Sequence, residues 1–164
     1  SAMVEALAGL ADLSDRLTIT HQTGEADLER IKAAYAGSAF SAADIRPFIS
    51  DIFVEFGKAD FVICRAGATT CAELAAAGKA AIMVPLPTAA DDHQRKNAEA
   101  LEKAGAAKMV VQSELSGERL AKEIAGLIES PETITAMEAA ARSMGRADAA
   151  EKTVDLIEEL KRNV

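Results

Sequence analysis

Residues 61–85 read FVICRAGATTCAELAAAGKAAIMVP, a pattern typical of a buried strand, a loop, a helix and a second buried strand. The apolar runs at 61–64 and 81–84 carry no polar residue on either face, as expected for strands inside a parallel sheet that helices cover on both sides. Residues 70–77 between them are rich in alanine, the strongest helix former, and Gly78 follows as a helix-ending residue. The segment therefore predicts a parallel β-α-β unit.

The same alternation of strand and helix patterns continues on both sides of this unit. Further strands are expected at 17–22, 45–48 and 108–112. The segment 45–48 contains Pro47, which favours an edge position. Helical spacing of apolar residues predicts helices over 4–13, 25–36, 51–58, 94–103, 116–128, 131–144 and 149–160. These expectations give an α/β fold, a Rossmann-like doubly wound parallel sheet.

The composition excludes several classes of protein and of partner. The chain has 164 residues, a length typical of one domain, with 49% hydrophobic and 27% charged residues, which excludes a disordered chain. The net charge of −8 argues against nucleic acid as a partner and against attachment to anionic lipid. No apolar run is long enough to span a membrane. We expect residues 1–3 to be a processing remnant and the starting Met, and residues 4–164 to form a single domain.

The chain contains two cysteines, Cys64 and Cys71, and two histidines, His21 and His93. Their spacing does not fit a zinc site. We expect two buried, reduced thiols, which favours a cytoplasmic location.

Ligands of open α/β sheets bind at the carboxyl ends of the strands, where four loops are of interest: 21–24, 48–50, 65–70 and 85–94. The loop at 65–70 holds small residues around Gly67 and leads into a helix. Small residues allow a phosphate to approach the backbone, and the N–H groups of a helix start attract anions. A plain strand-to-helix turn explains the same residues, so both interpretations stay open.

Several side chains in and near these loops also have two interpretations. Glu73 forms the capping-box pattern with Thr70, or it is a carboxylate that accepts two sugar hydroxyls. Asp92 is a natural N-cap; His93 and Gln94 would then be surface residues of the first turn, with Asn97 on the same side.

The other loop residues have simpler explanations. His21 and Gln22 fit hydrogen-bonded loop anchors, Phe48 and Ile49 fit core positions, and Arg65 fits a solvated or paired loop charge. No nucleophile–base pair, shared carboxylate pair or metal constellation can be read from the sequence, so binding is indicated more clearly than chemistry.

The motifs taken in order resemble a known family. They are HQTG at 21–24, FI at 48–49, CRAGATTCAEL at 64–74, Gly78 with VP at 84–85, HQ at 93–94 with NA at 97–98, and LEKAGAA at 101–107. Together they are similar to the carboxyl-terminal donor-binding domain of the bacterial transferases that add N-acetylglucosamine to the lipid-linked muramyl-pentapeptide of peptidoglycan. The resemblance covers residue 17 to the end of the chain.

The resemblance implies a GT-B fold and UDP-N-acetylglucosamine as the substrate, with no cofactor and no metal. It assigns the uracil to the backbone of Ile49 beside Phe48, and the ribose hydroxyls to Glu73. The remaining contacts implied are the diphosphate and sugar at Ala68, Thr69 and Thr70, and the N-acetylglucosamine hydroxyls at His93 and Gln94, with Asn97 nearby. The family reaction is an inverting displacement at the anomeric carbon. No catalytic residue is expected in this chain, because the general base should come from the other domain.

The chain also departs from the family pattern. The acceptor domain and the first strand of the donor domain, with its glycine-rich loop, are missing, so we expect a truncated chain that is inactive alone. Strands 17–22 and 61–64 would then flank a gap or pair directly, and exposed strand edges would favour self-association. The full-length enzyme, engaged in cell-wall biogenesis, cell shape and cell division, would lie peripherally at the cytoplasmic face of the inner membrane. The alternatives are a non-catalytic UDP-sugar-binding module or a different GT-B enzyme, an epimerase or a lipid glycosyltransferase.

Overall fold

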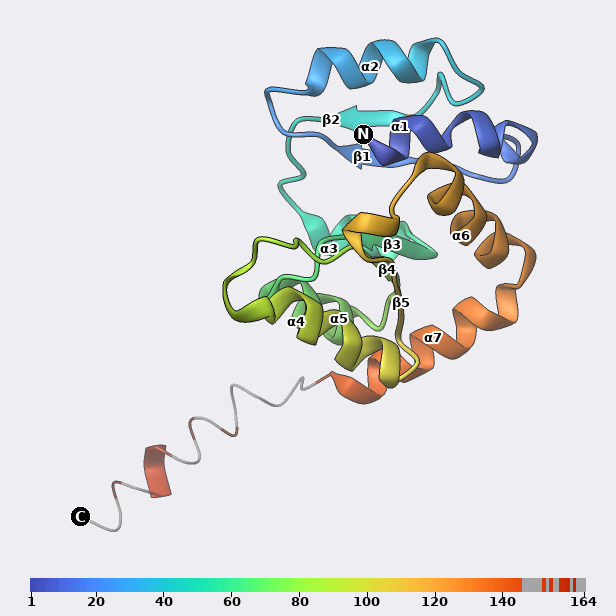
Figure 1. The fold of residues 1–164 in the computed structure, drawn as a ribbon. Coiled ribbons are helices and arrows are strands. Elements are labelled where there is room, and N and C mark those ends of the chain that lie inside the picture. The colour runs from blue at the N-terminus through green and yellow to red at the C-terminus, as the bar shows by residue number, and fades with distance from the viewer. Residues whose placement is uncertain (146–151, 153, 155–156, 160, 162–164) are drawn as a thin grey trace.

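The computed structural model describes residues 1–145, 152, 154, 157–159 and 161 (Figure 1). In chain order the elements are α1 (Ala2–Ala6), the 3₁₀ helix η1 (Ala8–Leu13), β1 (Thr20–Gln22), α2 (Leu28–Ala36), β2 (Asp44–Arg46), α3 (Ile52–Lys58), β3 (Phe61–Cys64), α4 (Ala68–Ala77), β4 (Ala80–Met83), the 3₁₀ turn η2 (Ala90–Asp92), α5 (His93–Lys103), β5 (Ala107–Met109), the 3₁₀ turn η3 (Gln112–Glu114), α6 (Gly117–Glu129) and α7 (Pro131–Met144).

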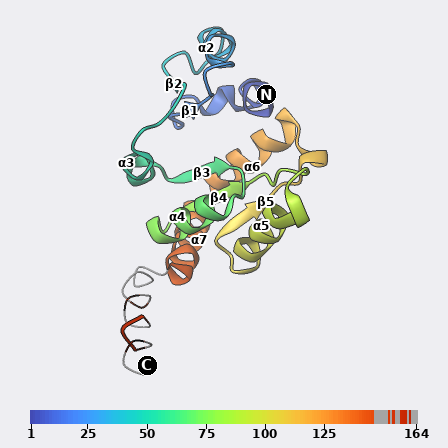
Figure 2. The same cartoon turned by 90° about the vertical axis from the view of Figure 1, so that its left-hand side faces the viewer.

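The strands form two parallel sheets, which confirms the predicted α/β class. β1 pairs with β2, and β3, β4 and β5 pair in that order. In the described part of the chain no ladder joins β1 to β3, so the direct pairing that was one of two expectations does not occur. Figures 1 and 2 show the β1–β2 sheet with α2 at one end of the molecule and the three-stranded sheet with α4 and α5 at the other.

Strand β4 is the centre of the larger sheet, and all four of its residues are buried. Side chains alternate across a strand, and here Ala80 and Ile82 face one hydrophobic cluster while Ala81 and Met83 face a second. The first cluster also contains Ile19, which precedes β1, and Ile45 of β2 packs against it. The two sheets are therefore separate in hydrogen bonding but packed against one apolar core.

Glycine allows α1 and η1 to pack closely on α6. A Cβ added at Gly117 would lie 2.4 Å from Glu5 Cβ and 2.6 Å from the Glu5 carbonyl carbon. A Cβ at Gly9 would lie 3.1 Å from Ala121 Cβ. Substitution at Gly117 therefore requires the backbone of α1 to move.

The predicted elements are present, with differences at their ends. The expected strand 17–22 is shorter at its amino-terminal end, because its ladder with β2 begins only at Thr20, opposite Asp44. The expected strand 45–48 ends at Arg46, before Pro47, a residue without an N–H. The expected helix 4–13 divides into α1 and η1. Gly78 ends α4 in the left-handed conformation at φ 63°, as predicted. The predicted helix over 149–160 falls largely outside the described residues.

Candidate functional site

The amino-terminal end of α4 faces the loop that follows β3. The helix begins at Ala68 with Gly67 in the N-cap position, and its first backbone hydrogen bond runs from Cys71 N–H to the Gly67 carbonyl at 2.9 Å. The backbone N–H groups of Ala68, Thr69 and Thr70 therefore have no intrahelical acceptor. Ala68 and Thr69 are exposed, so this end of the helix is open to an anionic ligand.

This helix start overturns the capping-box interpretation of Glu73. A capping box requires Thr70 at the N-cap, but Thr70 is the third residue of α4. Glu73 lies one turn later, three and four residues after Thr70 and Thr69, a spacing that places all three side chains on one side of the helix. The half-buried Glu73 carboxylate is thus on the same helical face as the two threonines.

Two side chains hold the loop between β3 and α4. Arg65 donates from Nη1 to the carbonyl of Val84 at 3.1 Å and to that of Pro85 at 3.4 Å. Asn97 donates from Nδ2 to the carbonyl of Ala66 at 3.0 Å. Arg65 is therefore an exposed loop charge that is hydrogen-bonded to backbone carbonyls. Together these contacts join α5 and the loops after β3 and β4 into one hydrogen-bonded unit.

The loop between β4 and α5 is fixed by Gln94, whose Oε1 accepts from the Leu86 N–H at 3.0 Å. Asp91 and Asp92 both have positive φ, 50° and 57°, which is uncommon for residues other than glycine. Asp92 is at the predicted N-cap position of α5, but its side chain makes no capping hydrogen bond because its backbone is left-handed there. The exposed His93 opens the helix.

The ends of β1 and β2 form a second hydrogen-bonded unit. Gln22 Oε1 accepts from the Ile49 N–H at 2.8 Å, a contact between residues 27 positions apart in sequence. The N–H of Gly24, at φ 75°, donates to the Pro47 carbonyl at 3.0 Å. His21 Nδ1 lies 3.0 Å from the Tyr35 hydroxyl. The prediction that His21 and Gln22 anchor this region is confirmed.

Burial controls the ionisation of the His21–Tyr35 pair. Removal of water lowers the pKa of His21 below its usual value of 6.5 and raises the pKa of Tyr35 to about 12. At neutral pH both side chains are therefore uncharged, and the tyrosine hydroxyl can donate to the imidazole.

Phe48 is not a core residue, contrary to the prediction from its apolar character. It is 70% exposed, and Phe53 and Val54 of α3 are also largely exposed, at 55% and 50%. Ile49 is half-buried. An exposed aromatic ring directly before a hydrogen-bonding backbone segment is a surface on which a flat ligand can stack.

The cysteines are free thiols, as predicted. Cys71 is buried, but Cys64, at the end of β3, is only half-buried, so the prediction that both are buried holds for Cys71 alone. Burial, with a smaller effect from Cys71, raises the pKa of Cys64 to about 12, so this thiol stays protonated and unreactive. Within the described residues no group of three His, Cys, Asp or Glu side chains could hold a metal ion.

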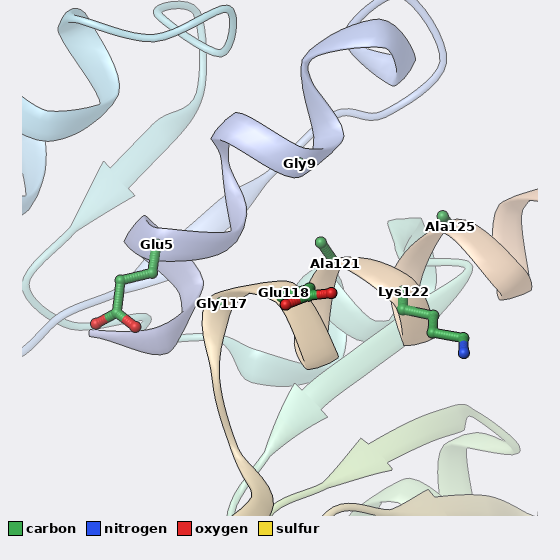
Figure 3. Close-up of a pocket in the computed structure, with 7 residues that line it drawn as sticks. All are labelled: Glu5, Gly9, Gly117, Glu118, Ala121, Lys122 and Ala125. Carbon is green, nitrogen blue, oxygen red and sulfur yellow. The ribbon is translucent and has the colours of Figure 1, made fainter.

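A groove between η1 and α6 was not predicted from the sequence. It has a volume of about 340 Å³ and is lined by Glu5, Gly9, Gly117, Glu118, Ala121, Lys122 and Ala125 (Figure 3). None of these residues is a predicted site residue. The signal that could have pointed to it is the pair Gly9 and Gly117, which line the groove where α1 and η1 pack closely on α6.

Residues 1–153 match the glycosyltransferase family 28 C-terminal domain. A relative from Geotalea daltonii is 49% identical over 155 residues, which make up 94% of this chain and 42% of the relative. A relative from Myxococcus xanthus is 47% identical over 158 residues, 96% of this chain and 41% of the relative. Both carry the name UDP-N-acetylglucosamine--N-acetylmuramyl-(pentapeptide) pyrophosphoryl-undecaprenol N-acetylglucosamine transferase. The chain thus spans about two fifths of their length.

Solved structures agree with the family match. The crystal structure of Acinetobacter baumannii MurG superposes with a TM-score of 0.83 at 39% identity, covering 96% of this chain and 46% of that protein. The glycosyltransferase VinC, crystallised with dTDP, superposes with a TM-score of 0.73 at 18% identity, covering 97% of this chain and 37% of that one, and supports the fold alone. No helix in the described part of this chain is both long enough and apolar enough to cross a membrane.

Proposed function

The chain belongs to the glycosyltransferase family 28 C-terminal domain family and has the fold of the carboxyl-terminal half of a GT-B glycosyltransferase, and from this premise we propose that it binds UDP-N-acetylglucosamine. The transfer that the donor serves is the addition of N-acetylglucosamine to the lipid-linked muramyl-pentapeptide, the reaction for which its relatives are named. The acceptor would be held by the part of such an enzyme that this chain does not include. The complete enzyme would work at the cytoplasmic face of the membrane.

The observation that carries the proposal is the open amino-terminal end of α4 within a hydrogen-bonded frame. Three backbone N–H groups point out of the helix start, and Asn97 and Arg65 fix the loop before it to α5 and to the end of β4. A diphosphate is the nucleotide-sugar group that such a helix start suits best. Ala68, Thr69 and Thr70 are assigned to the diphosphate and the adjoining sugar.

Glu73 is assigned to the ribose. Its carboxylate lies on the same helical face as Thr69 and Thr70, and two carboxylate oxygens match two neighbouring hydroxyls. With the capping-box interpretation excluded by the start of α4, Glu73 is not needed to cap the amino-terminal end of the helix. Phe48 and the Ile49 backbone are assigned to the uracil, with the exposed ring of Phe48 beside the base.

His93, Gln94 and Asn97 are assigned to the N-acetylglucosamine. Gln94 uses its oxygen to hold Leu86, which leaves its NH₂ group for a sugar hydroxyl. Asn97 uses its NH₂ group to hold Ala66, which leaves its oxygen as an acceptor. Each amide side chain can therefore hold its backbone partner and contact the ligand at the same time.

The proposed chemistry is an inverting displacement. The acceptor hydroxyl forms a bond to the anomeric carbon, the bond from that carbon to the phosphate oxygen breaks, and UDP leaves with the electron pair. The acceptor proton goes to a base outside this chain. Negative charge grows on the diphosphate as the bond breaks, and the start of α4 would stabilise that charge in the transition state.

Calorimetric titration tests the proposed binding. The chain is expected to bind UDP-N-acetylglucosamine and UDP, and Glu73→Ala should weaken both about 10- to 100-fold because a hydrogen-bonded charge is lost. Ser143→Ala on α7 is a matched control that should bind as the unsubstituted chain does. Comparison with UDP-glucose reports the sugar preference. Absence of heat with UDP and both UDP-sugars, or equal affinity in Glu73→Ala, would contradict the proposal.

A further inference from the structure

The Ile49 backbone N–H already donates a hydrogen bond to a side chain of this chain. Its acceptor is the side-chain carbonyl of Gln22 at 2.8 Å, and Gln22 is an exposed residue at the end of a different strand. The Ile49 N–H follows Phe48, whose ring is 70% exposed. A donor beside a bare aromatic ring is the arrangement that recognises a flat ligand with a carbonyl at its edge.

The Gln22 side chain offers the Ile49 N–H the same kind of acceptor as such a ligand would. A side-chain amide carbonyl and a pyrimidine carbonyl are both planar, neutral acceptors of one N–H hydrogen bond. The two cannot use the same N–H with full strength at the same time. A ligand carbonyl that reaches Ile49 must displace Gln22.

We propose that Gln22 is a specificity-determining residue that stands in for the base carbonyl: its side chain accepts from the Ile49 N–H and is displaced when a pyrimidine nucleotide binds. The inference rests on the proposed function, because it takes the assignment of the base to Phe48 and Ile49 as given. A base carbonyl must therefore bind the Ile49 N–H more strongly than Gln22 does. A ligand without a carbonyl at this position leaves the hydrogen bond between Gln22 and Ile49 in place.

The surrounding structure allows the Gln22 side chain to leave the Ile49 N–H. The rest of this turn is held independently of Gln22, since Thr23 N–H donates to the Arg46 carbonyl at 3.0 Å and Gly24 N–H to the Pro47 carbonyl at 3.0 Å. Release of Gln22 therefore does not undo the turn. An exposed amide regains water when it leaves, so the exchange costs only the net strength of one hydrogen bond.

Two substitutions test the proposal by the sign of their effects on UDP binding, measured by calorimetry on the full chain. Gln22→Ala removes the competitor and should tighten UDP binding about two- to tenfold, the range expected for one net hydrogen bond. Gln22→Glu supplies a stronger acceptor and should weaken UDP binding. Hydrogen exchange at the Ile49 amide, followed by NMR, should be faster in ligand-free Gln22→Ala than in the unsubstituted chain and equally slow in both with UDP.

Weaker or unchanged UDP binding by Gln22→Ala would overturn the inference while leaving the proposed function in place, because it would make Gln22 a direct ligand or a bystander. Absence of UDP binding by the unsubstituted chain would overturn the proposed function and the inference together. The folded state of each variant is checked by its NMR spectrum, and Thr135→Ala on α7 serves as a matched surface control that should bind UDP normally.

Discussion

Replacement of Asn97 tests the hydrogen-bonded frame behind the start of α4. Asn97 Nδ2 donates to the Ala66 carbonyl at 3.0 Å, and Ala66 is 0% exposed. Asn97→Ala removes this donor from a buried carbonyl. Asn97→Asp keeps the shape of the side chain but turns an oxygen toward the same carbonyl.

The structure sets the size of the effects. Loss of a donor to a buried carbonyl costs about 1–3 kcal/mol, so Asn97→Ala should lower the free energy of unfolding by about 2 kcal/mol. Asn97→Asp should cost more, because a carboxylate oxygen repels the carbonyl oxygen. Protonation would restore a donor, so the pKa of the new carboxyl group is raised in the folded state, and the extra cost should be complete above that pKa and shrink as pH falls through it.

Urea denaturation followed by circular dichroism measures these changes, and calorimetry with UDP-N-acetylglucosamine measures the effect on binding. At pH 7 the free energy of unfolding should be highest for the unsubstituted chain, lower for Asn97→Ala and lowest for Asn97→Asp. Affinity should follow the same order, with about a tenfold loss in Asn97→Ala if the loop before α4 shifts. An Asp variant as stable as the unsubstituted chain at pH 7, or an Ala variant with unchanged stability and affinity, would refute the reasoning.

Three further predictions follow from burial and packing. His21 has a lowered pKa in the folded state, so the stability it contributes is complete above pH 6.5 and is lost as pH falls through the lowered pKa; the drop in melting temperature from pH 7 to pH 5 should be smaller in His21→Phe. Cys64, with a pKa of about 12, should resist alkylation at pH 8 until denaturant is added, and rapid labelling of the native chain at this position would contradict its raised pKa. Gly117→Ala should destabilise the fold by about 1–3 kcal/mol because its Cβ would lie 2.4 Å from Glu5 Cβ, whereas Gly126→Ala on the same helix meets no atom within 4 Å and should be neutral or slightly stabilising.

Much of the fold could be predicted because its pattern is local. The apolar strand at 61–64, the alanine-rich helix and Gly78 follow from residue type and spacing alone, and the structure has them. The start of α4 could not be predicted as well, since Thr70 forms a good capping pattern with Glu73 while the helix begins two residues earlier. The arrangement of the loop before the helix, held by Asn97 from another element, depends on tertiary contacts that no local pattern records.

The candidate site was predictable in its positions but not in its contacts. Parallel strands bring their carboxyl ends to one edge, so loops 65–70 and 85–94 could be expected to meet. The exposure of Phe48 could not be derived from its apolar character, because exposure depends on what packs against it. The pairing of Gln22 with Ile49 joins residues 27 positions apart, and only the fold shows it.

The most direct test of the central claim is an NMR titration of the ¹⁵N-labelled chain with UDP-N-acetylglucosamine, because it reports where the ligand binds. The largest amide shifts are expected at 48–49, 65–73 and 86–97, around the start of α4 and the ends of the strands. Shifts centred on Gly9, Gly117 and Ala121, which line the groove between η1 and α6, would contradict this claim.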